Sequence, residues 1–107
     1  MVDESIVRAV RSYLQGLVER GLVVSFGVVI GSWVHTTADR WSDIDLLVVS
    51  SKFDAMRSRR DIDLLWRVAA RTDSRIEPIP CGERQWQEDS SSPIVEIARR
   101  EGQRISV

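Results

Sequence analysis

The segment at residues 44–50, IDLLVVS, constrains the fold more than any other part of the chain. Beyond its first carboxylates it is apolar on both faces of a strand, and such a strand lies centrally in a sheet. Residues 22–30, LVVSFGVVI, are a second β-branched and aromatic run between two glycines, which predicts another strand. Residues 75–80, RIEPIP, predict a short third strand at a sheet edge, because their two prolines cannot donate backbone hydrogen bonds. The pattern therefore predicts a small sheet.

Helices are expected on both sides of these strands along the chain. Residues 3–20 place apolar side chains at spacings of three and four, which is typical of an amphipathic helix. Asp3 is the expected N-cap, and Gly21 is the expected left-handed residue after the last turn. Residues 61–71 predict a second helix, capped by its first residue, Asp61.

The rest of the chain completes one domain. Residues 52–60 are polar and are expected to form a loop. Ser92 and Pro93 have the residue types of an N-cap and a first helical position, and Gly102 is expected to end the helix that they open. The predicted order is α-β-β-α-β-α, in an α/β (α+β) fold whose single domain spans residues 1–107.

Composition excludes several classes of protein. The 107 residues are 43% apolar and 29% charged, as in an ordinary globular domain and unlike a disordered chain. Fifteen Lys and Arg against sixteen Asp and Glu give a net charge of −1, so we expect no stable nucleic-acid binding. No apolar run approaches the roughly eighteen residues of a membrane span, and the acidic N-terminus is unlike a secretory signal. We expect a cytoplasmic protein with no membrane partner.

The cysteine and histidine content limits the kind of metal site. His35 and Cys81 are the only histidine and cysteine, whereas a structural zinc site takes about four such ligands. Any metal must therefore be bound by oxygen. Cys81 is expected to be an inert thiol near the surface of a protein in a reducing compartment.

The segment GSWVHTTADRWSDIDLLVV, at residues 31–49, carries the chemically informative residues. A Gly-Ser pair follows the first predicted strand, and Asp43 and Asp45 open the next one. Residues i and i+2 of a strand point to the same face with Cα atoms roughly 6 to 7 Å apart, so the two carboxylates project together. Hard oxygen ligands at this spacing favour Mg²⁺ or Mn²⁺, and two such ions fit an in-line displacement at phosphorus.

Gly31 and Ser32 add features that suit phosphate. Glycine allows close approach of the backbone, successive N–H groups form a concavity that binds anions, and the serine hydroxyl is a further donor. Trp33 and Trp41 lie nearby in the sequence and either stack on a nucleobase or pack the loop against the domain. Packing is the favoured interpretation.

With these residues in place, the chain resembles the minimal nucleotidyltransferases of the DNA polymerase β-like superfamily. Their pattern is Gly-Ser, a loop of about ten residues and Asp-x-Asp on a strand, matched here by Gly31, Ser32 and the run SDIDLLVV at residues 42–49. The resemblance implies the nucleotidyltransferase core, a small mixed β-sheet with flanking helices. It also implies that Asp43 and Asp45 bind two Mg²⁺ ions, with Mn²⁺ as an alternative, and that Gly31 and Ser32 bind the triphosphate of ATP.

The family also uses a third carboxylate on a later strand, which binds metal and accepts the proton of the attacking hydroxyl. Glu77 is the candidate because it lies in the strand-like run RIEPIP. The alternative is that Glu77 is only an exposed residue of an edge strand, and Asp73 is the second choice for the third carboxylate. Asp61 and Asp63 form another Asp-x-Asp, but they fall in a helical pattern, where i and i+2 point to different sides. We therefore interpret Asp61 as a cap and Asp63 as a partner of the helix dipole.

The chain departs from the family after the Gly-Ser pair. It carries His35 and Thr36 where the family often has an arginine and then a glycine. Arg40 and Lys52 flank the site in the sequence, and each either neutralises the triphosphate or has a surface role.

The resemblance implies transfer of a nucleoside monophosphate, AMP from ATP, to an acceptor hydroxyl with release of pyrophosphate. Free-standing members resemble antitoxins that modify a tyrosine on a helical HEPN-type toxin, so we expect such a partner. One domain of this size leaves no segment for an acceptor pocket, so the acceptor is expected to come from a partner. The alternatives are a non-catalytic nucleotide-binding antitoxin that acts by complex formation and a small-molecule nucleotidyltransferase. Nucleic-acid polymerisation fits less well, because it needs further domains and a basic surface.

Overall fold

Four strands form one mixed sheet in the computed structural model of the chain, which describes residues 2–34, 38–39, 41–88 and 91–107. The strands are β1 (Phe26–Ile30), β2 (Ile44–Val49), β3 (Ile76–Cys81) and β4 (Gln103–Ser106), in the spatial order β3-β2-β1-β4. β1 pairs antiparallel with β2 and β4, whereas β3 pairs parallel with β2. The predicted central position of β2 and edge position of β3 are confirmed.

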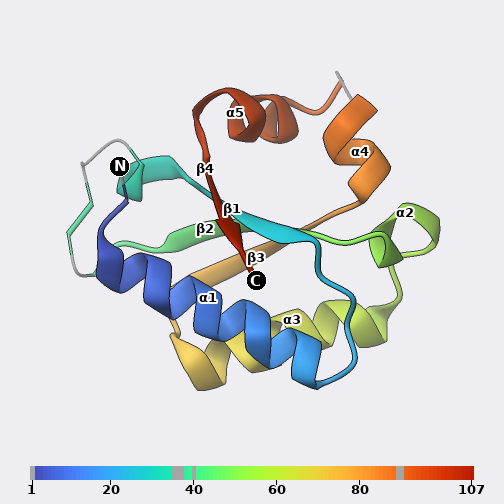
Figure 1. Cartoon of the computed structure of the whole chain (residues 1–107), viewed down its shortest axis with the longest axis horizontal. Helices are drawn as coiled ribbons and strands as arrows, with labels where there is room; N and C mark the ends of the chain where they lie inside the picture. Colours follow the sequence, from blue (N-terminus) through green and yellow to red (C-terminus); the bar gives the residue numbers. More distant parts are fainter. Residues whose placement is uncertain (1, 35–37, 40, 89–90) are drawn as a thin grey trace.

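Helices cover both faces of this sheet (Figure 1). α1 (Glu4–Glu19) and α3 (Arg59–Thr72) lie on one face, and α4 (Glu83–Glu88) and α5 (Pro93–Glu101) on the other. Alternate residues of β2 separate into two buried clusters, because successive side chains point to opposite faces. Leu46 and Val48 pack with α1 and α3, whereas Leu47 and Val49 pack with α5. The prediction of a small mixed sheet with flanking helices is therefore confirmed.

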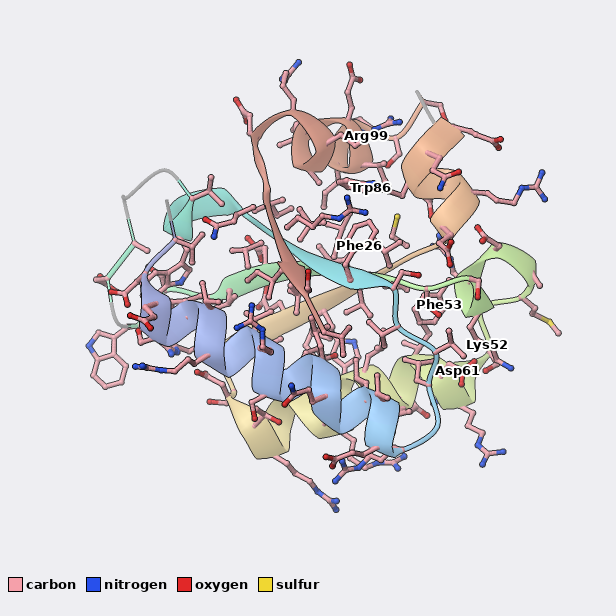
Figure 2. The ribbon with its side chains drawn as sticks, in the orientation of Figure 1. Phe26, Lys52, Phe53, Asp61, Trp86 and Arg99 are labelled. Atoms are coloured by element: carbon pink, nitrogen blue, oxygen red, sulfur yellow. The ribbon has the colours of Figure 1, made fainter. Side chains whose placement is uncertain are left out.

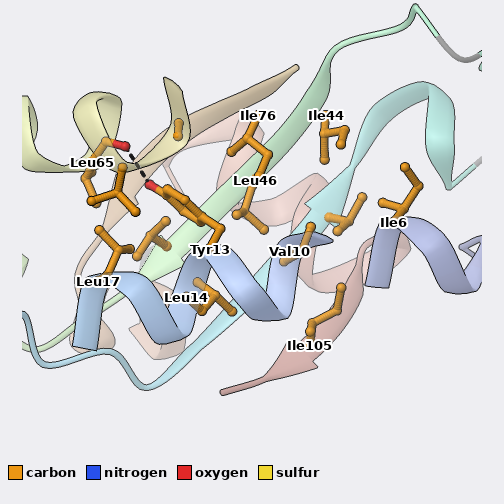
Figure 3. Close-up of a cluster of buried hydrophobic side chains, with 14 of the residues drawn as sticks. Ile6, Val10, Tyr13, Leu14, Leu17, Ile44, Leu46, Leu65, Ile76 and Ile105 are labelled. Carbon is orange, nitrogen blue, oxygen red and sulfur yellow. Dashed lines mark hydrogen bonds between the residues drawn. The ribbon is translucent and has the colours of Figure 1, made fainter. Parts of the chain in front are cut away.

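α1 has the predicted ends. Asp3 caps it by accepting a hydrogen bond from the Ser5 backbone N–H at 2.8 Å, and Gly21 after its last turn has φ +92°. Most of its apolar stripe is buried, and the Tyr13 hydroxyl donates to the Leu65 carbonyl oxygen of α3 at 2.9 Å (Figure 3). Burial raises the pKa of Tyr13 well above its usual value, so this hydrogen bond between the two helices persists at ordinary pH.

The second helical region differs from the prediction. Residues 52–60 are not all loop, because α2 (Lys52–Ala55) forms there and α3 begins at residue 59. Ser58 is the N-cap of α3 and accepts from the backbone N–H of Asp61 at 3.2 Å. Asp61 therefore lies in the first turn and is not the cap. Asp63 lies 3.8 Å from Arg59 in an exposed pair, one turn apart.

Three further elements depart from the predicted order α-β-β-α-β-α. β1 starts four residues later than expected, because its partner strand β2 ends opposite Phe26. α4 and β4 were not predicted; β4 is four residues long with one buried side chain, Ile105, and it depends on pairing with β1. α5 runs from Pro93 to Glu101 and ends at Gly102 as predicted.

The C-terminal end of β3 corrects the expectation for the cysteine. Cys81 is fully buried with Leu47 and Val49, and is not near the surface. The Phe26 and Trp86 rings meet edge to face in the same cluster, with centroids 5.5 Å apart (Figure 2). Among the described residues, no helix has the length and apolar character needed to cross a membrane.

Candidate functional site

The sheet brings three acidic side chains to one end of the molecule. Asp45 is the second residue of β2, and its register partners are Ile30 on β1 and Glu77 on β3. Asp43 lies two residues before Asp45, on the same face of the chain. Asp43 is exposed, whereas Asp45 and Glu77 are half-buried. We call Asp43, Asp45 and Glu77 the acidic cluster; they are the three carboxylates that the sequence singled out.

The electrostatics of Glu77 show that these carboxylates interact. Desolvation, followed by the negative charges of Asp43 and Asp45, raises the pKa of Glu77 above its ordinary value. Hydrogen bonding of the protonated Glu77 carboxyl to the two aspartates acts in the same direction. A bound cation would reverse this effect, because it stabilises the charged form of all three side chains.

The same side chains have the chemistry of a magnesium site. Carboxylate oxygens are the ligands that Mg²⁺ and Mn²⁺ prefer. Within the described part of the chain, however, no three His, Cys, Asp or Glu side chains are arranged closely enough to enclose an ion. The cluster therefore supplies suitable donors on adjacent strands, and metal binding stays a prediction.

Gly31 places the backbone against this cluster. It has φ +81°, and a Cβ atom added there would lie 2.9 Å from Asp45 Oδ2. Only a residue without a side chain combines this backbone conformation with this close approach. Gly31 begins η1 (Gly31–Trp33), a short 3₁₀ turn in which the Val34 N–H donates to the Gly31 carbonyl oxygen at 3.1 Å. Ser32 lies in this turn, and its side chain is outside the described part of the structure.

A contact that was not predicted ties η1 to the start of β2 and β3. Trp33 Nε1 donates to the Ser42 carbonyl oxygen at 3.3 Å, and the Arg75 guanidinium lies over the Trp33 ring, 5.6 Å from its centroid. Asp73 holds Arg75 through Nε at 3.0 Å and Nη2 at 2.7 Å. Sequence periodicity gives no signal for this arrangement, because it joins three segments that lie apart in the chain.

This contact bears on two alternatives from the sequence, which concern the third carboxylate and the role of the two tryptophans. Asp73 is engaged by Arg75, which holds the pKa of the Asp73 carboxyl below its usual value, whereas Glu77 is the register partner of Asp45. These positions favour Glu77 over Asp73 as the third carboxylate, whose role stays a prediction. Trp33 packs against the domain core as favoured, whereas Trp41 is 75% exposed and does not.

The structure places Lys52, one of the two basic residues that flank the site in the sequence, far from the acidic cluster. Lys52 is exposed on α2, which follows the end of β2 that is far from Asp45. Of its two alternative roles, this position favours the surface role over neutralisation of the triphosphate. About 13 Å of strand separates Asp45 from Val49, which is beyond the reach of a lysine side chain on the far side. His35, Thr36 and Arg40 lie outside the described residues.

Comparison with known proteins identifies a similar fold. No protein-family model and no curated protein sequence matches the chain. Among solved structures it is similar to the crystal structure of "a putative nucleotidyltransferase from Sulfolobus solfataricus", with a TM-score of 0.61 and 15% sequence identity. The match covers 76% of this chain and 70% of that chain. The two proteins share a fold, and at this identity the activity must be argued from the residues of the site.

Proposed function

We propose that this protein is a metal-dependent nucleotidyltransferase whose reaction takes place at the acidic cluster. The observation that carries the proposal is the meeting of three elements at one end of the sheet. Asp45 on the central strand is the register partner of Glu77 on the edge strand, and Gly31, with its positive φ, directly follows Ile30, the partner of Asp45 on β1. A fold similar to that of the Sulfolobus solfataricus protein described as "a putative nucleotidyltransferase" adds support.

In the proposed reaction, an acceptor hydroxyl attacks the α-phosphorus of ATP. The new bond joins the acceptor oxygen to that phosphorus, and the bond to the bridging oxygen of the β-phosphate breaks, so pyrophosphate leaves. Asp43, Asp45 and Glu77 would hold Mg²⁺, which neutralises charge on the phosphates when bound. Gly31 and the Ser32 backbone would bind the triphosphate next to Asp45. Glu77, on the strand beside Asp45, would accept the hydroxyl proton.

The acceptor and the nucleotide are the finer part of the proposal. The sequence resemblance supports AMP as the transferred group and a tyrosine of a helical HEPN-type toxin as the acceptor, with this chain as the antitoxin. An exposed Asp43 beside half-buried Asp45 and Glu77 supports an acceptor that approaches from solvent, as a protein side chain does.

The test compares two aspartates that each belong to an Asp-x-Asp. Purified protein is incubated with α-labelled ATP, Mg²⁺ and the product of the adjacent open reading frame, and label on the acceptor is measured. Asp45→Asn should abolish transfer and weaken Mn²⁺ binding measured by calorimetry. Asp63→Asn, exposed on α3, is the matched control and should leave both unchanged.

Two results would contradict the proposal. Full transfer by Asp45→Asn would show that the acidic cluster is not the reaction site. A tight complex with the neighbouring protein, but no label transfer by the wild type, would favour the non-catalytic antitoxin instead.

A further inference from the structure

A pocket lies at the end of the sheet opposite the acidic cluster. It has a volume of about 720 Å³ and is formed by the end of α1, the segment before β1, α2 and the first turns of α3. Four cationic side chains line it: Arg20, Lys52, Arg60 and Arg67. We call this the basic pocket. Its size is that of a small-molecule site.

The charges of the basic pocket are poorly compensated by the protein itself. Asp61 is the single carboxylate in its lining. Within the described part of the chain, no carboxylate lies within ion-pair distance of Lys52, Arg60 or Arg67, and Arg20 Nη1 donates to the Gly16 carbonyl oxygen at 3.1 Å. The local surplus of positive charge contrasts with the net charge of −1 of the whole chain. Like charges gathered in this way favour an anion between them.

Two further features affect the charge of the basic pocket. The N-terminus of α3, a 14-residue helix capped by Ser58, faces the pocket and adds positive potential. Asp61 Oδ2 is buried and has no hydrogen-bond partner among the described residues, so this single carboxylate of the lining opposes an anion in the pocket. Lys52 and Asp61, which both line the pocket, are labelled at this end of the molecule in Figure 2.

Charge density favours phosphate over carboxylate. A run of phosphate groups brings several negative charges into one small volume, whereas an acidic peptide needs one side chain for each charge. Three of the four cations are arginines, whose planar forks match phosphate oxygens. Val23, which is 61% exposed, lines the same pocket and offers apolar surface to the organic part of a ligand.

We infer that the basic pocket binds a run of phosphate groups, supplied either by a free polyphosphate or by the backbone of a nucleic-acid strand. The pocket and the acidic cluster lie at opposite ends of β2, so the inference does not depend on the proposed transfer reaction.

The experiment measures binding of two probes, tripolyphosphate by calorimetry and a fluorescent 12-nucleotide single-stranded RNA by anisotropy. EDTA is present, so that metal-dependent binding at the acidic cluster is silent. Arg60→Glu with Arg67→Glu should weaken binding at least tenfold. For RNA it should also reduce the slope of log affinity against log salt by about two, one for each lost cation. Loss for either probe supports the pocket. Loss for one probe alone identifies the source of the phosphate, and loss for both shows that the pocket accepts phosphate groups from either source.

Charge-matched variants separate the pocket from general electrostatics. Arg8→Glu with Arg100→Glu makes the same change in net charge at exposed positions outside the pocket, and should alter binding less than twofold. Asp61→Asn should strengthen binding several-fold, because it removes the single negative charge of the lining. Asp63→Asn, two residues along the same helix and outside the pocket, should not change it. If the double Glu variant does not fold, Arg60→Gln with Arg67→Gln replaces it, with an expected loss of about threefold.

Several outcomes would overturn the inference. They are absence of binding by the wild type, an equal loss in the two double variants, and binding of a hexaglutamate peptide as tightly as tripolyphosphate. Loss of binding in Asp45→Asn would place the ligand at the acidic cluster. Retained binding in Asp45→Asn together with lost transfer would instead separate the two sites.

Discussion

Gly31→Ala tests how closely the backbone and Asp45 are fitted together. The new methyl group would stand 2.9 Å from Asp45 Oδ2, on a residue with φ +81°. Gly21→Ala is a matched control, because Gly21 has φ +92° and an added Cβ there meets no atom within 4 Å. The two substitutions share the backbone cost and differ in the clash.

The expected magnitudes follow from these two terms. An L-residue in the left-handed region costs about 1–2 kcal/mol, and the reduced freedom of the unfolded chain offsets about 0.4–1 kcal/mol of it. This backbone cost should lower the unfolding free energy of each variant by about 1 kcal/mol, or the Tm by about 4–8 °C, and Gly31→Ala should lose more than Gly21→Ala because of the clash. In Gly31→Ala the Asp45 carboxylate must also retreat by about 0.5 Å to reach the 3.4 Å of ordinary contact. Displacements of this size cost roughly tenfold in rate, or about 1.4 kcal/mol in the barrier.

Urea unfolding, Mn²⁺ calorimetry and label transfer measure these effects. Gly31→Ala should weaken Mn²⁺ binding and slow transfer about tenfold, whereas Gly21→Ala should change stability alone. In an Asp45→Ala background, the stability cost of Gly31→Ala should fall to that of Gly21→Ala, because the clashing oxygen is gone. Equal Mn²⁺ binding by the two glycine variants, with no coupling to Asp45, would refute the close fit.

Three other substitutions test the electrostatics and the core. The pKa of Glu77 is raised in the folded protein, so the stability of the metal-free protein should fall as the pH rises from the ordinary pKa of 4.5 through the raised value. Glu77→Gln should remove this fall, measured by urea unfolding at a series of pH values. The pKa of Asp73 is lowered, so this carboxylate stabilises the fold above its ordinary pKa of 3.8, and that stabilisation is lost as the pH falls. Asp73→Asn should therefore cost about 1–2 kcal/mol of unfolding free energy at pH 7 and reduce the loss of stability on acidification. Tyr13→Phe should cost about 1 kcal/mol in thermal unfolding and leave Mn²⁺ binding unchanged, because it removes one buried hydrogen bond between α1 and α3. An unchanged Tm for Tyr13→Phe would mean that this bond contributes no net stability.

The elements with strong local patterns were predictable. α1 combines an apolar stripe, an N-cap and a C-terminal glycine, and β2 is apolar on both faces, so each sequence specifies its own structure. β4 could not be predicted, because QRIS buries one side chain and becomes a strand through its partner, β1. The cap of α3 was misassigned because Ser58 and Asp61 are both good cap residues, and the choice between them depends on where the chain leaves α2.

The site was predictable to the extent that strand periodicity governs it. The period of two placed Asp43 and Asp45 on one face, and the parallel register of β3 then brought Glu77 beside Asp45. The link from Asp73 through Arg75 to Trp33 joins distant segments and has no sequence signal. The net charge of the chain did not reveal the basic pocket, because the sum of all charges does not show which charged residues lie close together in the fold.

The prolines of β3 have a consequence for how another protein can approach the sheet. The carbonyl oxygens of Arg75 and Cys81 accept hydrogen bonds from the first residue of β2 and from the residue that follows β2. By alternation, Pro78 and Pro80 therefore face the outer edge. That edge has lost two backbone donors, which prevents a further strand from adding to the sheet and protects the domain from edge-to-edge aggregation. A partner protein therefore cannot bind beside Glu77 by adding a strand to the edge of β3. It must reach Glu77 with a side chain.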